Sequence, residues 1–448
     1  MFKKFTNGCV NIMNKYLPDP FLFAIILTLI VFVAGIIMTG QGPMDMMLHW
    51  ANGFWGLLPF SMQIAMVLVL GNTMASAGVF KRGLKHIAST AKTPSRAIMI
   101  TAFVSAICCW INWGFGLVIG ALLAKEIAKQ VKGVDYRLLI ASAYSGFVVW
   151  HGGISGSIPL GVATVGADGF VANTGGSLTE AIPTALTIFS PMNLTISALI
   201  IIGLPFVCKA MMPDKEHTIE VDSALLMEES EKVYEAKTPA DKLEQSRIVW
   251  ALVLVLGFAY IIYNIALNKM NALNLNFVNF IFMFAGILLH GNLKKYIDAF
   301  SESAKSASGI LLQFPFYAGI QGMMIGAVAD VSLAGVISTF FVGIATVKTF
   351  PLFTFLSAGI VNFFVPSGGG QWAVQGPIMM PAGLEIGVPA AKTAMAIAWG
   401  DAWTNMIQPF WALPALGIAG LSAKDIMGYC VITLLFSGVI IVAGFLIF

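Results

Sequence analysis

Long apolar runs dominate the chain, and they stay apolar on every helical face instead of alternating with polar positions. A helix that crosses the hydrocarbon core of a membrane needs about 20 apolar residues. We therefore expect an all-α polytopic membrane protein. The runs predict spanning helices at residues 20–40, 54–77, 138–165, 184–212, 248–268, 274–291, 307–326, 393–418 and 427–448.

Two further apolar stretches, 97–132 and 350–382, are predicted to enter the membrane and return on the same side. Basic residues flank the first stretch at both ends, and short loops rich in Lys and Arg belong in the cytoplasm. Its midpoint contains Asn112 and Gly114, a polar residue and a glycine of the kind that a tight turn requires. The second stretch turns at 365–372 and enters from the opposite side. We expect both stretches to be re-entrant hairpins.

The order span, span, hairpin, span, span occurs twice, and the second copy begins on the opposite side of the membrane. Inverted repeats with interrupted helices are typical of secondary transporters whose binding site lies near the midplane. The distribution of Lys and Arg places the N-terminus in the cytoplasm and the C-terminus in the periplasm. The predicted parts are a first repeat (1–212, with hairpin 97–132 and broken helix 138–165), a cytoplasmic linker (213–247), a connecting helix (248–268) and a second repeat (274–448, with hairpin 350–382 and broken helix 393–418).

The spans at 138–165 and 393–418 are predicted to unwind in the middle of the membrane, because glycine, proline and polar residues cluster in both. Freed backbone groups cannot face lipid, so they line a protein cavity or bind a ligand. The N–H groups at the start of a half-helix suit an anion, and unwound carbonyl groups suit a cation. The candidate substrate-binding residues are Asn112, Gly114, Trp150, Ser155, Ser157, Asn362, Ser367, Gly369, Gln371, Trp403, Asn405 and Gln408.

Asp401 is an acidic residue inside an apolar span, and acids inside a membrane are functional by default. It either holds a cation such as Na⁺, carries a proton, or is a structural acceptor. The side-chain oxygen atoms of Thr404, Asn405 and Gln408 and a helix break at Gly400 favour a cation site. His151, in the other interrupted span, either titrates or is held by backbone carbonyl groups. The candidate ion-coupling residues are Asn112, Gly153, Ser367, Asp401 and Thr404.

Composition narrows the class of protein further. The chain has 448 residues, of which 58% are hydrophobic and 10% are charged, against the roughly 25% charged residues of soluble domains. A soluble enzyme is excluded, and a net charge of +3 is too small for a nucleic-acid-binding protein. The five cysteines have no metal-binding spacing, so we expect no cofactor other than a coupling ion, Na⁺ or H⁺. The absence of Lys and Arg from the predicted breaks favours a small monocarboxylate over a dicarboxylate.

Five motifs along the chain are long and specific: Leu17-Pro-Asp-Pro20, Ile111-Asn-Trp-Gly-Phe-Gly-Leu117, Gly368-Gly-Gly-Gln-Trp372, Gln375-Gly-Pro377 and Gln408-Pro-Phe-Trp-Ala-Leu-Pro-Ala-Leu416. They resemble motifs of the bacterial short-chain fatty acid transporter family, which includes the carrier associated with acetoacetate and butyrate breakdown. The resemblance covers nearly the whole chain. It implies the ion transporter superfamily, with a scaffold domain, a transport domain that contains two hairpins, elevator movement and usually a homodimer. Sodium-coupled relatives carry Ser-Asn-Thr at each hairpin tip, whereas Ile-Asn-Trp-Gly and Pro-Ser-Gly-Gly-Gly stand at these places here.

We therefore expect a secondary active transporter of short-chain monocarboxylates, such as butyrate or acetoacetate, in a bacterial inner membrane. Its partners would be the substrate, the lipid bilayer and a second copy of the chain. One alternative is a carrier of C4-dicarboxylates or amino-acid derivatives on the same fold. Another is an intramembrane hydrolase, for which Ser157 and His151 are the candidate nucleophile and base.

Overall fold

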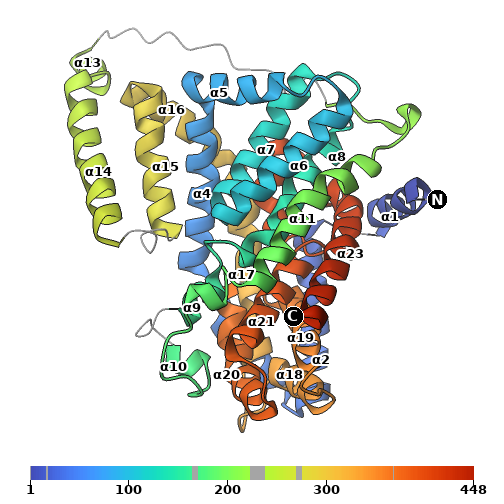
Figure 1. Cartoon of the computed structure of the whole chain (residues 1–448). Helices are drawn as coiled ribbons and strands as arrows, with labels where there is room; N and C mark the ends of the chain where they lie inside the picture. The colour runs from blue at the N-terminus through green and yellow to red at the C-terminus, as the bar shows by residue number, and fades with distance from the viewer. Residues whose placement is uncertain (1, 17–18, 164–169, 222–237, 269–274, 367) are drawn as a thin grey trace.

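The computed structural model describes residues 2–16, 19–163, 170–221, 238–268, 275–366 and 368–448 (Figure 1). Helices make up its regular structure, apart from one isolated bridge between Val328 and Val331. The expected all-helical fold is confirmed. Among the described residues, six helical stretches are long and apolar enough to cross a membrane: Phe21–Thr39, Pro94–Ile111, Tyr136–Val162, Pro191–Ala210, Pro239–Leu267 and Ala423–Ile447.

The order of elements in the first half recurs in the second. Each half begins with four helices that are alternately long and short. Two helices joined by a tight turn follow, and after them come an interrupted helix and a final long helix. The first half contains α2 (Pro20–Thr39), α3 (Pro43–Gly53), α4 (Leu58–Ser76), α5 (Gly78–Ser89), α6 (Pro94–Ile111), α7 (Trp113–Gln130), α8 (Tyr136–Ser145), η1 (Gly146–Gly152), α9 (Ser157–Val162), α10 (Phe170–Asn173), η2 (Thr184–Leu186) and α11 (Pro191–Ala210).

The second half repeats this order with α15 to α23. Its elements are α15 (Leu275–His290), α16 (Leu293–Ala304), η5 (Lys305–Ala307), α17 (Ser308–Ile325), α18 (Leu333–Gly343), α19 (Phe350–Phe364), α20 (Gly368–Ile386), α21 (Ala390–Thr404), η6 (Phe410–Ala412), α22 (Leu413–Ala419) and α23 (Ala423–Ile447). Outside the two halves lie α1 (Phe2–Tyr16), η3 (Lys215–His217), α13 (Pro239–Glu244) and α14 (Arg247–Asn268).

The two halves pack against each other through corresponding helices. Helix α4 packs against α15, and its counterpart α17 packs against α2. The hairpin α6–α7 lies in the upper half of Figure 1 and the hairpin α19–α20 in the lower half. This arrangement agrees with the two oppositely directed hairpins that the sequence predicts.

The first hairpin turns because Asn112 ends one helix and begins the next. Its backbone is extended (φ −150°, ψ 117°), which stops α6, and its side-chain oxygen accepts a hydrogen bond from Phe115 N–H at 3.0 Å. This is an ordinary N-cap. In the second hairpin α20 already begins at Gly368, so the glycines that we assigned to the tip form the first helical turn instead. Ser367 lies outside the described residues.

Both interrupted spans are broken, but the second break differs from the prediction. The first span passes from α8 through η1 and becomes irregular at 153–156 before α9. In the second span α21 continues through Gly400 to Thr404, and only 405–409 are irregular. The expected helix break at Gly400 is therefore wrong. Gly400 instead allows close packing, because an added Cβ would lie 2.5 Å from Cβ of Ala358.

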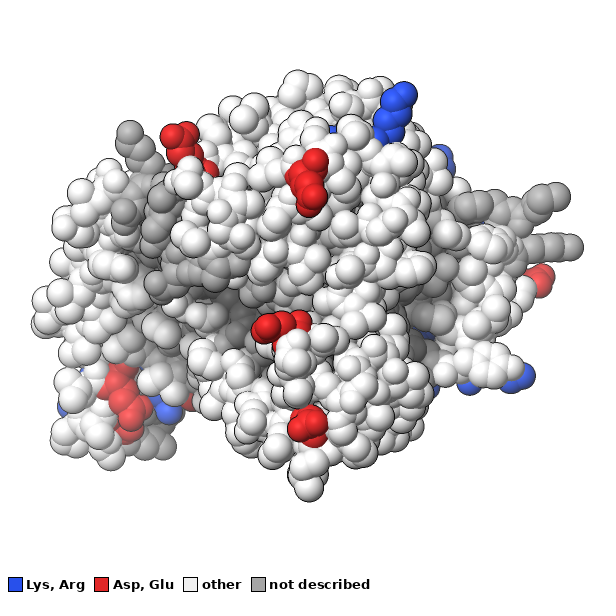
Figure 2. Space-filling model, turned by 90° about the horizontal axis from the view of Figure 1, so that it is seen from below, with Lys and Arg blue, Asp and Glu red and all other residues white. Residues whose placement is uncertain are grey.

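The hydropathy pattern did not predict several helix boundaries and short helices. The span expected at 184–212 begins only at Pro191, where the Ser190 hydroxyl caps the helix by accepting from Asn193 N–H at 3.2 Å. Amphipathic helices α1, α5 and α16 were also missed, because they are too polar to be read as spans. Figure 2 shows the lower face of the molecule, where Asp and Glu are scattered over a mostly uncharged surface and Lys and Arg lie mainly toward the rim.

Candidate functional site

The tip of the first hairpin is hydrogen-bonded to the break in the first interrupted span. Trp113 N–H donates to the Ser155 hydroxyl at 3.0 Å, and Ile154 N–H donates to the carbonyl oxygen of Trp110 at 2.8 Å. Gly153 allows this approach, since an added Cβ would overlap the Trp110 carbonyl oxygen. The freed backbone groups of this break are thus bonded partly by the hairpin tip.

The second hairpin is held to α21 by Asn362. Its side-chain Nδ2 donates to the carbonyl oxygen of Asp401 at 2.8 Å and to the hydroxyl of Thr404 at 2.9 Å. The Thr404 hydroxyl also lies 2.9 Å from the carbonyl oxygen of Gly359, on the same hairpin. Asn362 is fully buried, whereas its counterpart Asn112 is only half-buried.

The two interrupted spans meet in the middle of the molecule. The indole N–H of Trp150 donates to Oδ1 of Asn405 at 3.0 Å, and the Tyr144 hydroxyl donates to the carbonyl oxygen of Asn405 at 2.7 Å. The Trp150 ring stacks on the His151 ring with 3.5 Å between centroids. We call six fully or largely buried residues the central network: Trp150, His151, Asn362, Asp401, Thr404 and Asn405.

His151 and Asp401 form a buried pair within the central network. Nδ1 of His151 lies 2.9 Å from the carbonyl oxygen of Ala398 and 3.4 Å from Oδ1 of Asp401. Both side chains are 0% exposed. Neither carboxylate oxygen of Asp401 has a hydrogen-bond partner among the described residues, and Nε2 of His151 has none either.

Two amide groups after the second break have N–H groups without acceptors. Oδ1 of Asn405 accepts from the Trp150 indole, and Oε1 of Gln408 accepts from Phe410 N–H at 2.9 Å. Indole and backbone N–H groups only donate, so these partners fix which amide atom is oxygen. Nδ2 of Asn405 and Nε2 of Gln408 are buried and lack a partner among the described residues. Two unused donors suit an anion.

Unused acceptors lie on the side of the second hairpin. Nε2 of Gln371 donates to the carbonyl oxygen of Ala358 at 2.8 Å, which leaves Oε1 without a partner among the described residues. Oδ1 of Asn362 and both oxygen atoms of Asp401 also lack a hydrogen-bond partner among the described residues. Because a buried polar atom without a partner costs about 1–3 kcal/mol, such a group of acceptors suits a proton or a cation.

The remaining candidate residues lie elsewhere or have other partners. Ser157 is exposed, and neither ring nitrogen of His151 bonds to its hydroxyl, so the structure does not join the proposed nucleophile and base. Gly369 is exposed and Gly114 is buried beside Val67. The indole N–H of Trp403 donates at 2.7 Å to the carbonyl oxygen of Leu434, a residue outside the central network.

Two functional-looking residues were missed in the sequence. Asn193 is fully buried, accepts from the Trp399 indole at 3.0 Å and donates to the carbonyl oxygen of Gly152 at 2.8 Å. It thereby ties α11 to both interrupted spans. Gln375 donates to the hydroxyl groups of Ser338 and Ser357. A polar amide inside an apolar run was the available signal for both, and Gln375 also lies in one of the motifs that resemble the family.

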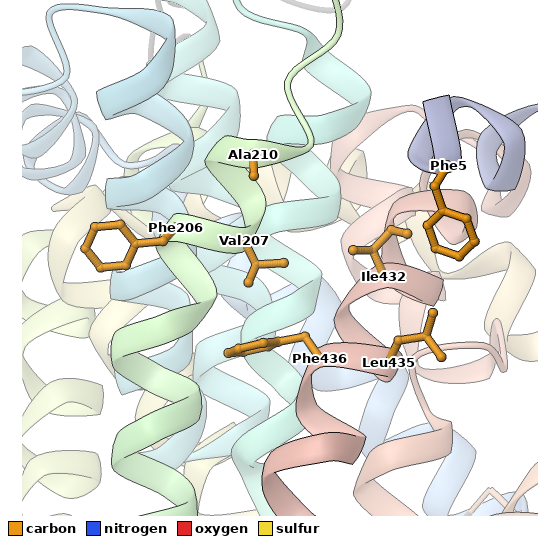
Figure 3. Close-up of a pocket in the computed structure, with 7 residues that line it drawn as sticks. All are labelled: Phe5, Phe206, Val207, Ala210, Ile432, Leu435 and Phe436. Carbon is orange, nitrogen blue, oxygen red and sulfur yellow. The ribbon is translucent and has the colours of Figure 1, made fainter. Parts of the chain in front are cut away.

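Two apolar cavities open on the surface. One, of about 480 Å³, has Gly359, Trp403 and Thr404 among its lining residues and so adjoins the central network. The other, of about 500 Å³, lies between α1, α11 and α23 (Figure 3). Its lining residues are all apolar, and none of them belongs to the central network. They are Phe5, Phe206, Val207, Ala210, Ile432, Leu435 and Phe436.

Comparison with known proteins assigns the family. The model of the family described as "Short chain fatty acid transporter" matches residues 1–448. The chain belongs to this family. Among its family relatives, a protein of Escherichia coli (strain K12) is 45% identical over 451 residues, which cover 100% of each chain. A protein of Haemophilus influenzae is 43% identical over 448 residues, which cover 99% of each chain.

Both of these proteins carry the name "Putative short-chain fatty acid transporter". The family assignment confirms the resemblance found in the sequence and makes the chain a multi-pass membrane protein of a transporter family. Among solved structures, the Alcanivorax borkumensis YdaH transporter aligns with 96% of this chain and 97% of its own, at 14% identity and a TM-score of 0.44. A likeness of that degree carries no argument about this chain.

Proposed function

We propose that this member of the short-chain fatty acid transporter family is a secondary active transporter of monocarboxylates of the butyrate and acetoacetate class. Transport would be coupled to a cation, Na⁺ or H⁺, and would proceed by an elevator movement. The alternative substrates are C4-dicarboxylates and amino-acid derivatives. They serve as competing substrates in the transport assay that tests the proposal.

One observation carries this proposal: buried side-chain donors and buried side-chain acceptors that lack partners among the described residues occur together, in and beside the central network. The donors of Asn405 and Gln408 suit a carboxylate, and the acceptors around Asp401 suit a coupling cation. No Lys or Arg occurs at 146–159, 362–372 or 400–411. Without a guanidinium group for bidentate binding, a small number of amide donors suits one carboxylate better than two.

The proposed elevator movement is supported by the way in which the helices divide. Helices α2, α3, α4, α15 and α17 pack largely with one another, as a scaffold would. The two hairpins and the interrupted spans pack together as a second group. We expect the second group to move against the first. A homodimer is expected from the family resemblance, and exposed apolar side chains of α14, such as Val255 and Leu256, are available for a second subunit or for lipid.

We also propose that the protein lies in a bacterial inner membrane with the upper end of Figure 1 in the cytoplasm. Basic residues of the missed helices α5 and α16 support this orientation, since both helices lie at that end (Figure 1). Short segments rich in Lys and Arg remain on the cytoplasmic side.

Counterflow of labelled butyrate into proteoliposomes tests the proposed substrate. Unlabelled butyrate or acetoacetate inside should drive transient accumulation of label, and external succinate or an acylated amino acid should compete only weakly. Protein-free liposomes measure the passive entry of the undissociated acid. Strong competition by succinate would overturn the monocarboxylate assignment, and absence of counterflow with every acid would overturn the proposed function.

A further inference from the structure

We propose that the coupling cation is a proton and that His151 and Asp401 carry it as a pair. This inference rests on the proposed function and deepens it, because it names the ion and adds His151 to the transport machinery. It is carried by the contacts of two residues from opposite halves of the chain. They approach each other only where the two interrupted spans cross.

The hydrogen bonds of His151 define its neutral form. Nδ1 faces the carbonyl oxygen of Ala398 at 2.9 Å, and a carbonyl oxygen only accepts, so Nδ1 carries the hydrogen. Nε2 is then an acceptor, and it has no donor among the described residues. The imidazole is therefore held by one nitrogen, while the other is available for a proton.

The carboxyl group of Asp401 also has acceptor atoms without a donor among the described residues. Both of its oxygen atoms are buried without a hydrogen bond among the described residues, and Nδ1 of His151 lies 3.4 Å from Oδ1. An ionised carboxylate in such surroundings is costly unless it is paired. A proton on Asp401, or a second proton on the His151 ring beside an ionised Asp401, removes the uncompensated charge. The pair would therefore hold one proton more than an ionised Asp401 and a neutral His151 hold between them.

Three of the residues expected to favour sodium, Thr404, Asn405 and Gln408, have side-chain oxygens that already have hydrogen-bond partners. The hydroxyl of Thr404 accepts from Asn362 and lies against two carbonyl oxygens. The side-chain oxygens of Asn405 and Gln408 already accept from Trp150 and from Phe410 N–H. A hard cation prefers a shell of several oxygen atoms. Among the described residues, the side-chain oxygens here without a partner are those of Asp401, Oδ1 of Asn362 and Oε1 of Gln371. They are fewer than the roughly six ligands of such a shell, whereas a proton needs only one.

The second hairpin covers the free nitrogen of His151. A Cβ added to Gly368, the first residue of α20, would lie 2.6 Å from Nε2 and 2.8 Å from the Trp150 ring. Only a glycine fits this closely against the imidazole. A movement of the hairpin would therefore uncover Nε2.

Other titratable groups on the helices around η1 do not form such a pair with His151. Tyr144 donates to the Asn405 backbone, and Cys108 and Cys109 lie on α6. The other charged residues of these helices and of α20 lie within about two turns of a helix end, and Asp401 is the charged group for which the described residues show an ion-pair distance to His151. These residues are Arg96, Lys125, Glu126, Lys129, Arg137, Lys209, Glu385 and Lys392.

Three variants in proteoliposomes test the proposal. Asp401→Asn cannot ionise, and His151→Asn keeps an N–H group for the Ala398 carbonyl but has no second nitrogen. His290→Asn is the matched control, since the His290 Nε2 also lies 2.9 Å from a backbone carbonyl oxygen, that of Thr73. Accumulation of labelled acetoacetate is measured with an acidic exterior, and with a Na⁺ gradient at equal pH, after subtraction of protein-free liposomes.

We expect the acidic exterior to drive accumulation in wild type and in His290→Asn, and the Na⁺ gradient to drive none. Asp401→Asn and His151→Asn should lose accumulation while still showing measurable exchange of labelled for unlabelled substrate. The infrared band of a protonated carboxyl group should be present in wild type and absent from Asp401→Asn.

The pair would be overturned by Na⁺-driven accumulation at equal pH in wild type, or by normal pH-driven accumulation in Asp401→Asn or His151→Asn. If Asp401→Asn does not fold, His151→Asn and the infrared band of wild type decide. Exchange without any pH-driven accumulation in wild type would overturn this inference alone. Absence of exchange would overturn the proposed function as well.

Discussion

Asn112 and Asn362 occupy corresponding positions in the two hairpins, but their side chains have different hydrogen-bond partners. Asn362 is fully buried and bonds to the backbone of Asp401 and the hydroxyl of Thr404. Asn112 is half-buried and caps α7 through Phe115. The sequence predicts that both serve transport directly. In the structure Asn362 connects the second hairpin to α21, whereas Asn112 has a capping role that is sufficient to explain its presence. A direct role of either residue in transport stays a prediction.

Asn362→Ala should reduce transport strongly. The change removes two hydrogen bonds that connect the second hairpin to α21, and we expect the initial rate of counterflow per folded molecule to fall at least about tenfold, the equivalent of 1.4 kcal/mol. Thermal stability in detergent is measured on the same samples. A fall in folded protein with unchanged transport per molecule would give Asn362 a packing role only.

Asn112→Ala should act mainly on stability. Loss of an N-cap costs about 1 kcal/mol, and Asn112→Ser should recover most of it because serine also caps helices. The measurement is the melting temperature of the three proteins in the same detergent. A large loss of transport in both variants, without loss of stability, would show that the Asn112 amide itself contacts substrate or ion.

At the scale of elements, each hairpin tip is packed against an interrupted span. The first contact depends on Gly153, where an added Cβ would overlap the carbonyl oxygen of Trp110. The second depends on Asn362 and on Gly400, which lets α21 approach α19 closely. The breaks themselves follow from local sequence, whereas their bonding partners come from hairpins that are distant along the chain.

Gly153→Ala should therefore damage the site, while Gly83→Ala should not. An added Cβ at Gly83, on α5, meets no atom within 4 Å. In Gly153→Ala the tip must move away from the break, which separates Ile154 N–H from the Trp110 carbonyl oxygen. We expect loss of counterflow and a lower melting temperature for Gly153→Ala only. Wild-type behaviour of this variant would mean that the tip is not packed so closely against the break.

At the scale of the whole molecule, an inverted arrangement places the two hairpins in opposite halves (Figure 1). Each hairpin thus approaches the centre from its own side. The central network receives Trp150 and His151 from the first half, and Asn362, Asp401, Thr404 and Asn405 from the second. A folding intermediate in which only one half is folded would therefore lack the central network.

Cysteine labelling tests this topology in a background without the five native cysteines. Lys92 and Lys132, at the two ends of the first hairpin, and Glu385, at the end of the second, are all exposed. Cysteines at 92 and 132 should react with impermeant thiol reagents only from the cytoplasmic side, and a cysteine at 385 only from the outside. Labelling of 92 and 132 from opposite sides would refute the re-entrant hairpin.

The sequence by itself determined the features that depend on local physics. Apolar runs of sufficient length can be stable only in lipid, and they predicted most long helices. Clusters of glycine and proline predicted two interrupted spans, because such residues are costly inside a helix. The motif Ile111-Asn-Trp-Gly and its neighbours predicted the family, which the comparisons confirm.

Only the tertiary structure decided which polar groups have partners. Asp401 and His151 are 250 residues apart in number, and no local pattern predicts that one ring nitrogen faces Ala398 while the other is left free. Gly400 shows the same limit, since its helix survives through packing against α19. Intrinsic propensity is a weak preference that tertiary contacts override, and the partners of a buried group are fixed by the crossing of distant segments.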